Sequence, residues 1–68
     1  MRIKYFPDTD TAHIEFLDNE VQETREINEN TYIDMDVNGN IVNMTIEHAK
    51  HTAGLWEISY QEMSPQTV

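Results

Sequence analysis

The sequence predicts a small α+β domain that is mainly antiparallel β: a meander sheet of four or five strands built from two hairpins, with a short helix or turn near the C-terminus. Apolar and polar residues alternate over most of the chain, which is typical of half-buried strands. Turn sequences separate the alternating stretches. The 68 residues include no cysteine, so we expect one domain, residues 1–63, without disulfides and with a frayed tail at 64–68.

The first predicted hairpin joins residues 1–6 to residues 11–16 through the turn Pro7-Asp8-Thr9-Asp10. A four-residue turn that closes on Phe6 and Thr11 determines which residues face each other. The apolar pairs are then Met1 with Phe16, Ile3 with Ile14, and Tyr5 with Ala12. The pairs on the other side are Arg2 with Glu15 and Lys4 with His13. The placement of an acid opposite a base supports this register.

The second predicted hairpin joins residues 32–37 to residues 40–46 through Asn38-Gly39. Asn-Gly favours a two-residue type I′ turn because both central residues need positive φ. The facing pairs are then Met35 with Val42 and Ile33 with Met44. The carboxylates of this hairpin, on its reverse face, are Asp34 and Asp36. A Gly39-Asn40 loop would shift the pairing by two positions and leave every side chain on the same face.

Three further elements follow from the remaining sequence. Residues 23–27 predict a short strand before a turn at residues 28–30. Residues 48–53 predict a turn or a short helix that ends at Gly54. Residues 55–61 fit both a strand and a helical face, and we favour a strand because aromatic and β-branched residues are frequent there.

One face of the predicted sheet is apolar and needs a cover. Its residues are Ile3, Tyr5, Ile14, Phe16, Ile33, Met35, Val42, Met44 and Ile46. A single core of this size without disulfides is only marginally stable. The cover is either the C-terminal segment around Leu55, Trp56 and Ile58 or a second copy of the sheet. We expect a homodimer with oligomer contacts at Leu55, Trp56 and Tyr60, because tryptophan and tyrosine contribute strongly to interfaces.

The charge is strongly acidic, with 13 acidic against 4 basic side chains and a net charge of -9. Between Asp8 and Glu47 the only base is Arg25. A phosphate backbone would be repelled, so we expect no direct binding of nucleic acid. A basic partner protein would be attracted and steered towards the acids. The same charge also suits a small sheet that needs only solubility and protected edges.

Two patterns resemble metal sites. Residues 34–39 match the first half of a calcium loop, but Thr45 stands where the loop needs a bidentate glutamate, and the flanks alternate like strands. His48 and His51, with His13 as a third, are candidate ligands for zinc or nickel, although only two of them are close in sequence. We expect no metal or other cofactor, and we retain the histidine site as the weaker alternative.

Enzymatic activity is not expected. Acid–base catalysis by paired carboxylates needs a concave, partly dry site, and a sheet this small offers little concavity. The two glycines exclude a glycine-rich phosphate loop, and no hydroxyl residue has a base in a recognisable arrangement. No stretch reaches membrane-spanning length and no signal peptide is evident, so we expect an unprocessed cytoplasmic protein.

Three motifs follow one another in a recognisable order. They are Tyr-Phe-Pro-Asp-Thr-Asp-Thr-Ala-His-Ile at residues 5–14, Glu-Thr-Arg-Glu-Ile at 23–27, and Ile-Asp-Met-Asp-Val-Asn-Gly-Asn-Ile-Val at 33–42. Together they resemble the YuzE-like family of small bacterial proteins, domain of unknown function 2283, over residues 1–50. Family members usually read Val-Gly-Ile-Glu-Ile-Leu-Asp-Ala-Ser after the second hairpin, whereas residues 42–50 of this chain lack that glycine and that serine.

The resemblance implies a compact antiparallel sheet with no established activity and no agreed catalytic residues. Some members are similar to the acidic half of two-gene modules whose other half resembles a ribonuclease-type toxin, which implies an antitoxin-like role. We therefore expect a non-enzymatic protein whose carboxylates occupy the RNA-binding surface of a basic partner. The candidate contacts are Asp34, Asp36, Glu26 and Glu29. The alternative is a protein that binds a small ligand or a divalent metal through its histidines.

Overall fold

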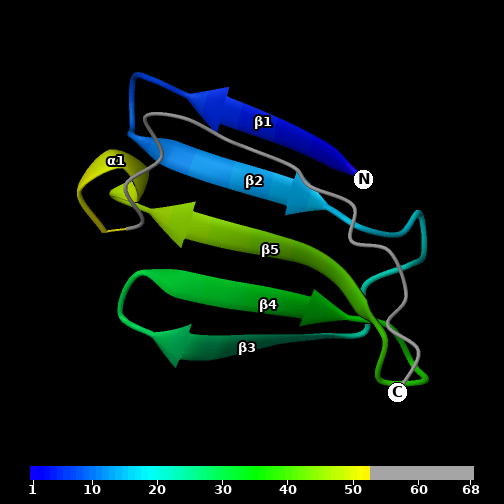
Figure 1. The fold of residues 1–68 in the computed structure, drawn as a ribbon. Coiled ribbons are helices and arrows are strands. Elements are labelled where there is room, and N and C mark those ends of the chain that lie inside the picture. The colour runs from blue at the N-terminus through cyan, green and yellow to red at the C-terminus, as the bar shows by residue number, and fades with distance from the viewer. Residues whose placement is uncertain (53–68) are drawn as a thin grey trace, which may run out of the picture.

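The computed structural model describes residues 1–52, which form a five-stranded antiparallel sheet and one short helix (Figure 1). The elements are β1 (Arg2–Phe6), β2 (Thr11–Glu15), β3 (Glu23–Asn28), β4 (Thr31–Met35), β5 (Ile41–Glu47) and α1 (Ala49–Thr52). The predicted fold class is confirmed. The predictions for residues 53–68 lie outside the described residues; they concern Gly54, the strand at 55–61, the tail at 64–68, and the contacts Leu55, Trp56 and Tyr60.

The strand order across the sheet is β1-β2-β5-β4-β3, so the strands do not all follow one another in sequence. β3, β4 and β5 form one meander, and β1 and β2 form a separate hairpin. The two units join where β2 pairs with β5, which places Ala12 opposite Ile46 and Ile14 opposite Met44. Residues 16–22 then lead from β2 to β3 at the far edge of the sheet (Figure 1). The longest strand, β5, lies at the centre of the sheet, between β2 and β4.

The β1–β2 hairpin has the predicted register. Its pairs are Arg2 with Glu15, Ile3 with Ile14, Lys4 with His13, Tyr5 with Ala12, and Phe6 with Thr11. Asp10 closes the turn with a φ of 54°, a conformation that aspartate tolerates better than most residues. Its Oδ1 accepts a hydrogen bond from the Tyr5 hydroxyl at 2.6 Å. The turn is therefore fixed to the first strand by a side chain as well as by the backbone.

The β4–β5 hairpin follows the predicted register except near its turn. Ile33 pairs with Met44 as predicted, and Asp34 pairs with Asn43. Met35 pairs with Ile41, so the prediction that it faces Val42 is wrong. The register shifts between Asp34 and Met35, which makes Val42 an extra residue on β5, a β-bulge.

The bulge accompanies a three-residue loop, Val37-Asn38-Gly39, in place of the predicted two-residue turn. The Asp36 N–H donates to the Asn40 carbonyl at 3.0 Å, and the Gly39 N–H donates to the Asp36 carbonyl at 3.1 Å. Gly39 has a φ of 82°, the left-handed conformation that often ends a loop of this length. The extra loop residue and the extra strand residue compensate each other, so the pairing beyond the bulge returns to the predicted register.

The β3–β4 hairpin confirms the predicted strand at residues 23–27 and the turn after it. The Asn28 side chain accepts a hydrogen bond from the Asn30 N–H at 2.8 Å, which closes the turn locally. The register shifts between Glu26 and Asn28, so Ile27 forms a bulge at the end of the strand and is 55% exposed.

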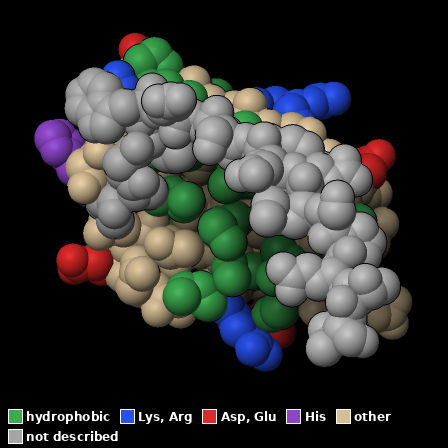
Figure 2. Space-filling view, viewed as in Figure 1, with side chains coloured by type: hydrophobic (Ala, Val, Ile, Leu, Met, Phe, Trp, Pro, Cys, Tyr) green, Lys and Arg blue, Asp and Glu red, His purple; other side chains and the backbone are tan. Residues whose placement is uncertain are grey.

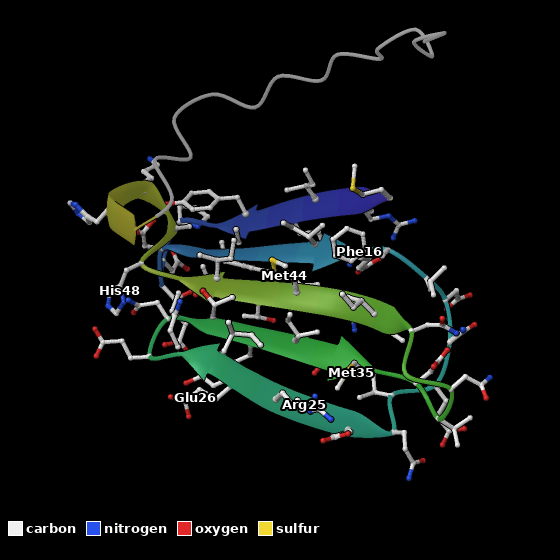
Figure 3. All side chains as sticks on the ribbon, turned by 60° about the horizontal axis from the view of Figure 1, so that its bottom comes forward. Phe16, Arg25, Glu26, Met35, Met44 and His48 are labelled. Atoms are coloured by element: carbon white, nitrogen blue, oxygen red, sulfur yellow. The ribbon has the colours of Figure 1, made fainter. Side chains whose placement is uncertain are left out.

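On the face shown in Figure 2, hydrophobic side chains gather over the middle of the sheet. Phe16, Met35 and Met44 lie on the same side of the ribbon (Figure 3). Ala12 is 0% and Val42 is 2% exposed, whereas Ile3 on the edge strand is 37% exposed. Full burial is therefore confined to small and medium side chains among the described residues. The homodimer stays a prediction.

α1 packs against the β1–β2 turn, and it confirms the short helix predicted after β5. The Ala49 N–H donates to the Asp10 carbonyl at 2.8 Å, and the Lys50 N–H donates to Asp10 Oδ1 at 3.2 Å. Ala49 is buried, and Lys50 Nζ lies 5.3 Å from the centre of the Tyr5 ring, within cation–π range.

In the part of the chain that the structure describes, no helix is long and apolar enough to cross a membrane.

We predict that Gly39→Ala lowers the free energy of unfolding by about 1 kcal/mol, because alanine is strained at this positive φ. No atom lies within 4 Å of the position of the added Cβ, so the backbone alone accounts for the loss. Urea unfolding followed by circular dichroism measures it. Gly39→Asn is the control, because asparagine tolerates the left-handed region and should lose less. Equal losses from both substitutions would contradict this explanation.

Candidate functional site

The face opposite the apolar one, which we call the polar face, carries polar side chains from all five strands. The strand registers align many of them in two rows across the sheet. One row contains Lys4, His13, Thr45, Tyr32 and Glu26, and the other contains Arg2, Glu15, Asn43, Asp34 and Thr24. Both bases lie on the edge strand β1, and Glu26 lies on the opposite edge strand β3. The two ends of the polar face therefore differ in charge.

At the β1–β2 end, the charges compensate one another. Glu15 forms ion pairs with Lys4 at 3.0 Å and with Arg2 at 3.8 Å. The hydrogen bond from Lys4 is the main reason that the pKa of Glu15 lies below its usual value. His13 Nε2 lies 4.0 Å from the same carboxylate. Glu15 therefore offsets part of the positive charge of the two bases, and this end of the polar face stays weakly positive.

Towards β3 and β4, several acids of the polar face belong to no ion pair within residues 1–52. We call Glu26, Asp34 and Glu47, with Glu29 in the adjoining β3–β4 turn, the acidic surface. The Glu47 N–H donates to the Asn30 carbonyl at 2.7 Å, which holds the end of β5 beside that turn. The pKa of Tyr32 is raised mainly by the charge of Glu47, then by desolvation and by Glu26. Tyr32 therefore lies within the negative potential of these carboxylates.

The four lysine and arginine side chains of the sequence lie elsewhere. Arg2 and Lys4 are on β1, and Lys50 is on α1. Arg25 neighbours Glu26 in β3 but points to the other side of the sheet (Figure 3). Its Nε is bound to Glu23 at 3.0 Å, so its charge is compensated there. None of the ion pairs within residues 1–52 involves a carboxylate of the acidic surface.

Asp34 is the ordered member of the acidic surface. Its Oδ1 accepts a hydrogen bond from the Thr24 hydroxyl at 2.7 Å, and its Oδ2 accepts one from the Asn43 amide at 3.2 Å. The side chain is half-buried between its two neighbouring strands. These contacts hold the carboxylate in place and still leave it on the polar face, as the sequence predicted.

Asp36 does not lie on the outer surface, so the prediction that it meets solvent or a partner is wrong. It is 7% exposed and folds back over the β4–β5 loop. Its Oδ1 accepts hydrogen bonds from the Asn38 N–H at 2.9 Å and the Asn40 N–H at 2.8 Å. Its Oδ2 accepts hydrogen bonds from the side-chain amides of Asn19 at 2.9 Å and Asn40 at 3.1 Å. These bonds lower its pKa from 3.8 to about 2, led by that from the Asn40 N–H.

The hydrogen bonds of Asp36 also explain the calcium-loop pattern at residues 34–39. Four N–H donors surround the Asp36 carboxylate, so its oxygens are occupied by donors and not directed towards a cation. The carboxylate satisfies the backbone of a hairpin loop and ties that loop to the β2–β3 connection through Asn19.

Two of the three histidines share a turn, because the His51 N–H donates to the His48 carbonyl at 3.1 Å, whereas His13 lies on β2. His13 Nδ1 lies 3.2 Å from the Thr45 hydroxyl on the polar face. His48 follows β5, and its Nδ1 lies 3.1 Å from Asn30 Oδ1. His51 is exposed on α1. Within residues 1–52, no three histidine, aspartate or glutamate side chains are grouped as metal ligands.

The comparison with protein families agrees with these motifs. The family model described as Protein of unknown function (DUF2283) matches residues 2–50. The chain belongs to this family. The matched residues include all five strands and the start of α1, so the sheet and its polar face are the DUF2283 domain. No significant match was found among curated proteins or among solved structures.

Sequence reasoning missed two contributors to the site of this DUF2283 domain. Glu47 was not selected, although Asn43, Thr45 and Glu47 alternate along the polar side of β5 and the period of two could have identified it. Asn19 was not selected either, because it lies 17 residues from its partner Asp36 in a connection without periodicity. No local pattern indicates that contact.

We predict that Asp36→Asn lowers the melting temperature at pH 7 by roughly 5 °C or more, because the loop amides lose a charged acceptor. A carboxyl group with a lower pKa in the folded state stabilises the fold above its unfolded pKa. This contribution is lost as the pH falls from about 4 to about 2. The gap between wild type and variant should therefore narrow over that range in thermal melts.

The matched control is Asp8→Asn, which removes an exposed carboxylate from the first turn and should change the melting temperature little. A gap between wild type and Asp36→Asn that stays constant from pH 7 to pH 2 would contradict the assignment. Carboxyl carbon shifts followed by NMR would locate the titration of Asp36 directly.

Proposed function

We propose that this DUF2283 domain is a non-enzymatic interaction protein whose acidic surface binds a basic partner protein. The observation that carries the proposal is the separation of charge across the polar face. Glu15 is ion-paired with both bases of β1, whereas the ion pairs within residues 1–52 include none of Glu26, Asp34 and Glu47. Arg25, next to Glu26 in β3, is paired with Glu23. Uncompensated charge at one end of a flat face attracts and orients a partner of opposite charge.

The arrangement of the acids supports binding as well as attraction. Thr24 and Asn43 already hold the Asp34 carboxylate, so a partner lysine or arginine would meet it with little further loss of side-chain entropy. Glu26 and Glu29 are exposed at the edge of the sheet, where they contribute to the long-range field. Asp36 takes no part, because it is buried in its own loop.

The partner class that we propose is a protein with a basic, RNA-binding surface. Carboxylates on a rigid face are suited to cover lysines and arginines that would otherwise contact phosphates. This gives the antitoxin-like role that the family resemblance implies: the domain neutralises the partner by occupying its RNA site. The same charge disfavours direct contact of the domain with RNA.

We predict that the double variant Glu26→Lys with Glu29→Lys lowers partner capture by about tenfold or more, because it reverses the charge of the acidic surface. Affinity-tagged protein is incubated with lysate of the native cell, and the captured proteins are quantified by mass spectrometry. The matched control is Asp18→Lys with Glu20→Lys, an equal change of charge in the exposed β2–β3 connection. The control should retain capture.

Equal capture by both double variants would overturn the role of the acidic surface. The antitoxin-like role has a separate readout, in which the purified partner is tested for RNA binding with and without the wild-type domain. Wild type should displace the RNA, and the Glu26→Lys, Glu29→Lys variant should not. A captured partner that binds RNA equally well with and without the domain would overturn the antitoxin-like role alone.

A further inference from the structure

We propose that the partner binds by strand addition: an extended basic segment of the partner pairs with the outer edge of β3. The inference rests on the proposed function and specifies how the acidic surface is used. It follows from an open sheet edge that runs beside uncompensated acids.

Among the strands that the structure describes, β3 is an edge strand. It stands at one end of the strand order and pairs with β4 on its inner side. Among residues 1–52, no strand pairs with its outer side, and all six of its residues are exposed. In an antiparallel ladder, alternate residues direct their N–H and C=O groups away from the paired strand. β3 therefore offers a row of backbone donors and acceptors to an added strand.

The side chains along this edge favour an added strand with basic residues on the polar face. Thr24 and Glu26 lie on the polar face, next to Asp34 and Tyr32 on β4. An added strand would place alternate side chains about 5 Å from Thr24 and Glu26 on that face. Lysine or arginine at those positions would reach the carboxylates of Glu26 and Asp34. On the other face, Arg25 is already paired with Glu23. The residues of the added strand that face this side therefore need no charge.

The opposite edge of the sheet does not suit the same partner. β1 is also exposed and also ends the strand order, but its polar-face side chains are Arg2, Lys4 and Phe6. A basic segment added there would face two cations, which is unfavourable in a cross-strand pair. Glu15 offsets only part of the charge of these two cations, so charge favours β3 over β1 as the edge for a basic segment.

A second copy of this chain is a poorer occupant of the β3 edge. Self-pairing would bring Glu23, Glu26 and Glu29 of one copy near the same acids of the other, in a protein with a net charge of -9. The bulge at Ile27 ends regular pairing after four residues, which limits the hydrogen bonds that would offset this repulsion. A basic segment meets the same edge with attraction in place of repulsion.

The probe is an acetylated hexapeptide amide of alternating lysine and valine, titrated into the ¹⁵N-labelled full chain. We expect the largest amide shifts along β3 and slower hydrogen exchange of its outward N–H groups. Two further peptides carry N-methyl groups on either the lysines or the valines. In an added strand, the backbone nitrogens of alternate residues face the same way, so either the lysine nitrogens or the valine nitrogens point towards β3 and the others point to solvent. One N-methylated peptide should therefore lose about tenfold or more in affinity, and the other should bind nearly as well as the parent.

Two protein variants connect this test to the acidic surface. Glu26→Lys should weaken peptide binding by about tenfold or more, whereas the matched Glu20→Lys in the β2–β3 connection should change it by less than about twofold. If both N-methylated peptides bind as the parent does while Glu26→Lys still weakens binding, strand addition is overturned and the acidic surface stands. If Glu26→Lys and Glu20→Lys act alike, the acidic surface itself fails.

The remaining outcomes also decide the proposal. Shifts that centre on β1, or no binding of the parent peptide at low salt, would overturn strand addition at β3. Changes in the β3 amides on dilution of the protein alone would show that a second copy takes the edge. The capture experiment with full-length partner is independent of all three peptides, so these last outcomes overturn strand addition and leave the proposed function to that experiment.

Discussion

The pairing of β2 with β5 is the contact on which the rest of this structure depends. It joins two units that are each only a hairpin or a three-stranded meander, neither of which buries much apolar surface alone. Its register sets Ala12 against Ile46 and His13 against Thr45, so the apolar and polar sides of both units coincide. A shift of one residue would mix the two faces. The apolar face, the polar face and the charge separation all follow from this register.

The two aspartates of the second hairpin, Asp34 and Asp36, have different structural roles. Asp34 lies inside the regular ladder, where alternation directs it to the polar face beside Thr24 and Asn43. Asp36 lies where the ladder gives way to a loop, and the free N–H groups of that loop capture its carboxylate. The first aspartate contributes to a surface. The second contributes to the fold, because a loop with unsatisfied amides would cost stability.

This difference explains how far the sequence could predict the structure. The β1–β2 register was predictable because the length of a local turn determines every pair, and the whole ladder agrees with it. Near Gly39 the same reasoning was wrong by one residue, because a longer loop and a bulge at Val42 compensate each other and leave the alternation unchanged. The exposure of Asp36 was wrong for a related reason: periodicity determines the face of a side chain only inside the ladder. The β2–β5 pairing has no local signal, since any two strands with the same alternation would fit.

The acidic surface is a product of the strand order more than of the composition. An excess of acids alone is compatible with a protein that needs only solubility. The strand order places both polar-face bases on β1 and leaves β3 beside Glu26, Asp34 and Glu47, so a chain with few cations has one compensated edge and one acidic edge. Had β2 paired with β3, as in a sequential meander, β1 would remain an edge but β5 would replace β3 at the other. The acids of β3 would then lie inside the sheet, and its backbone would have no open side to offer.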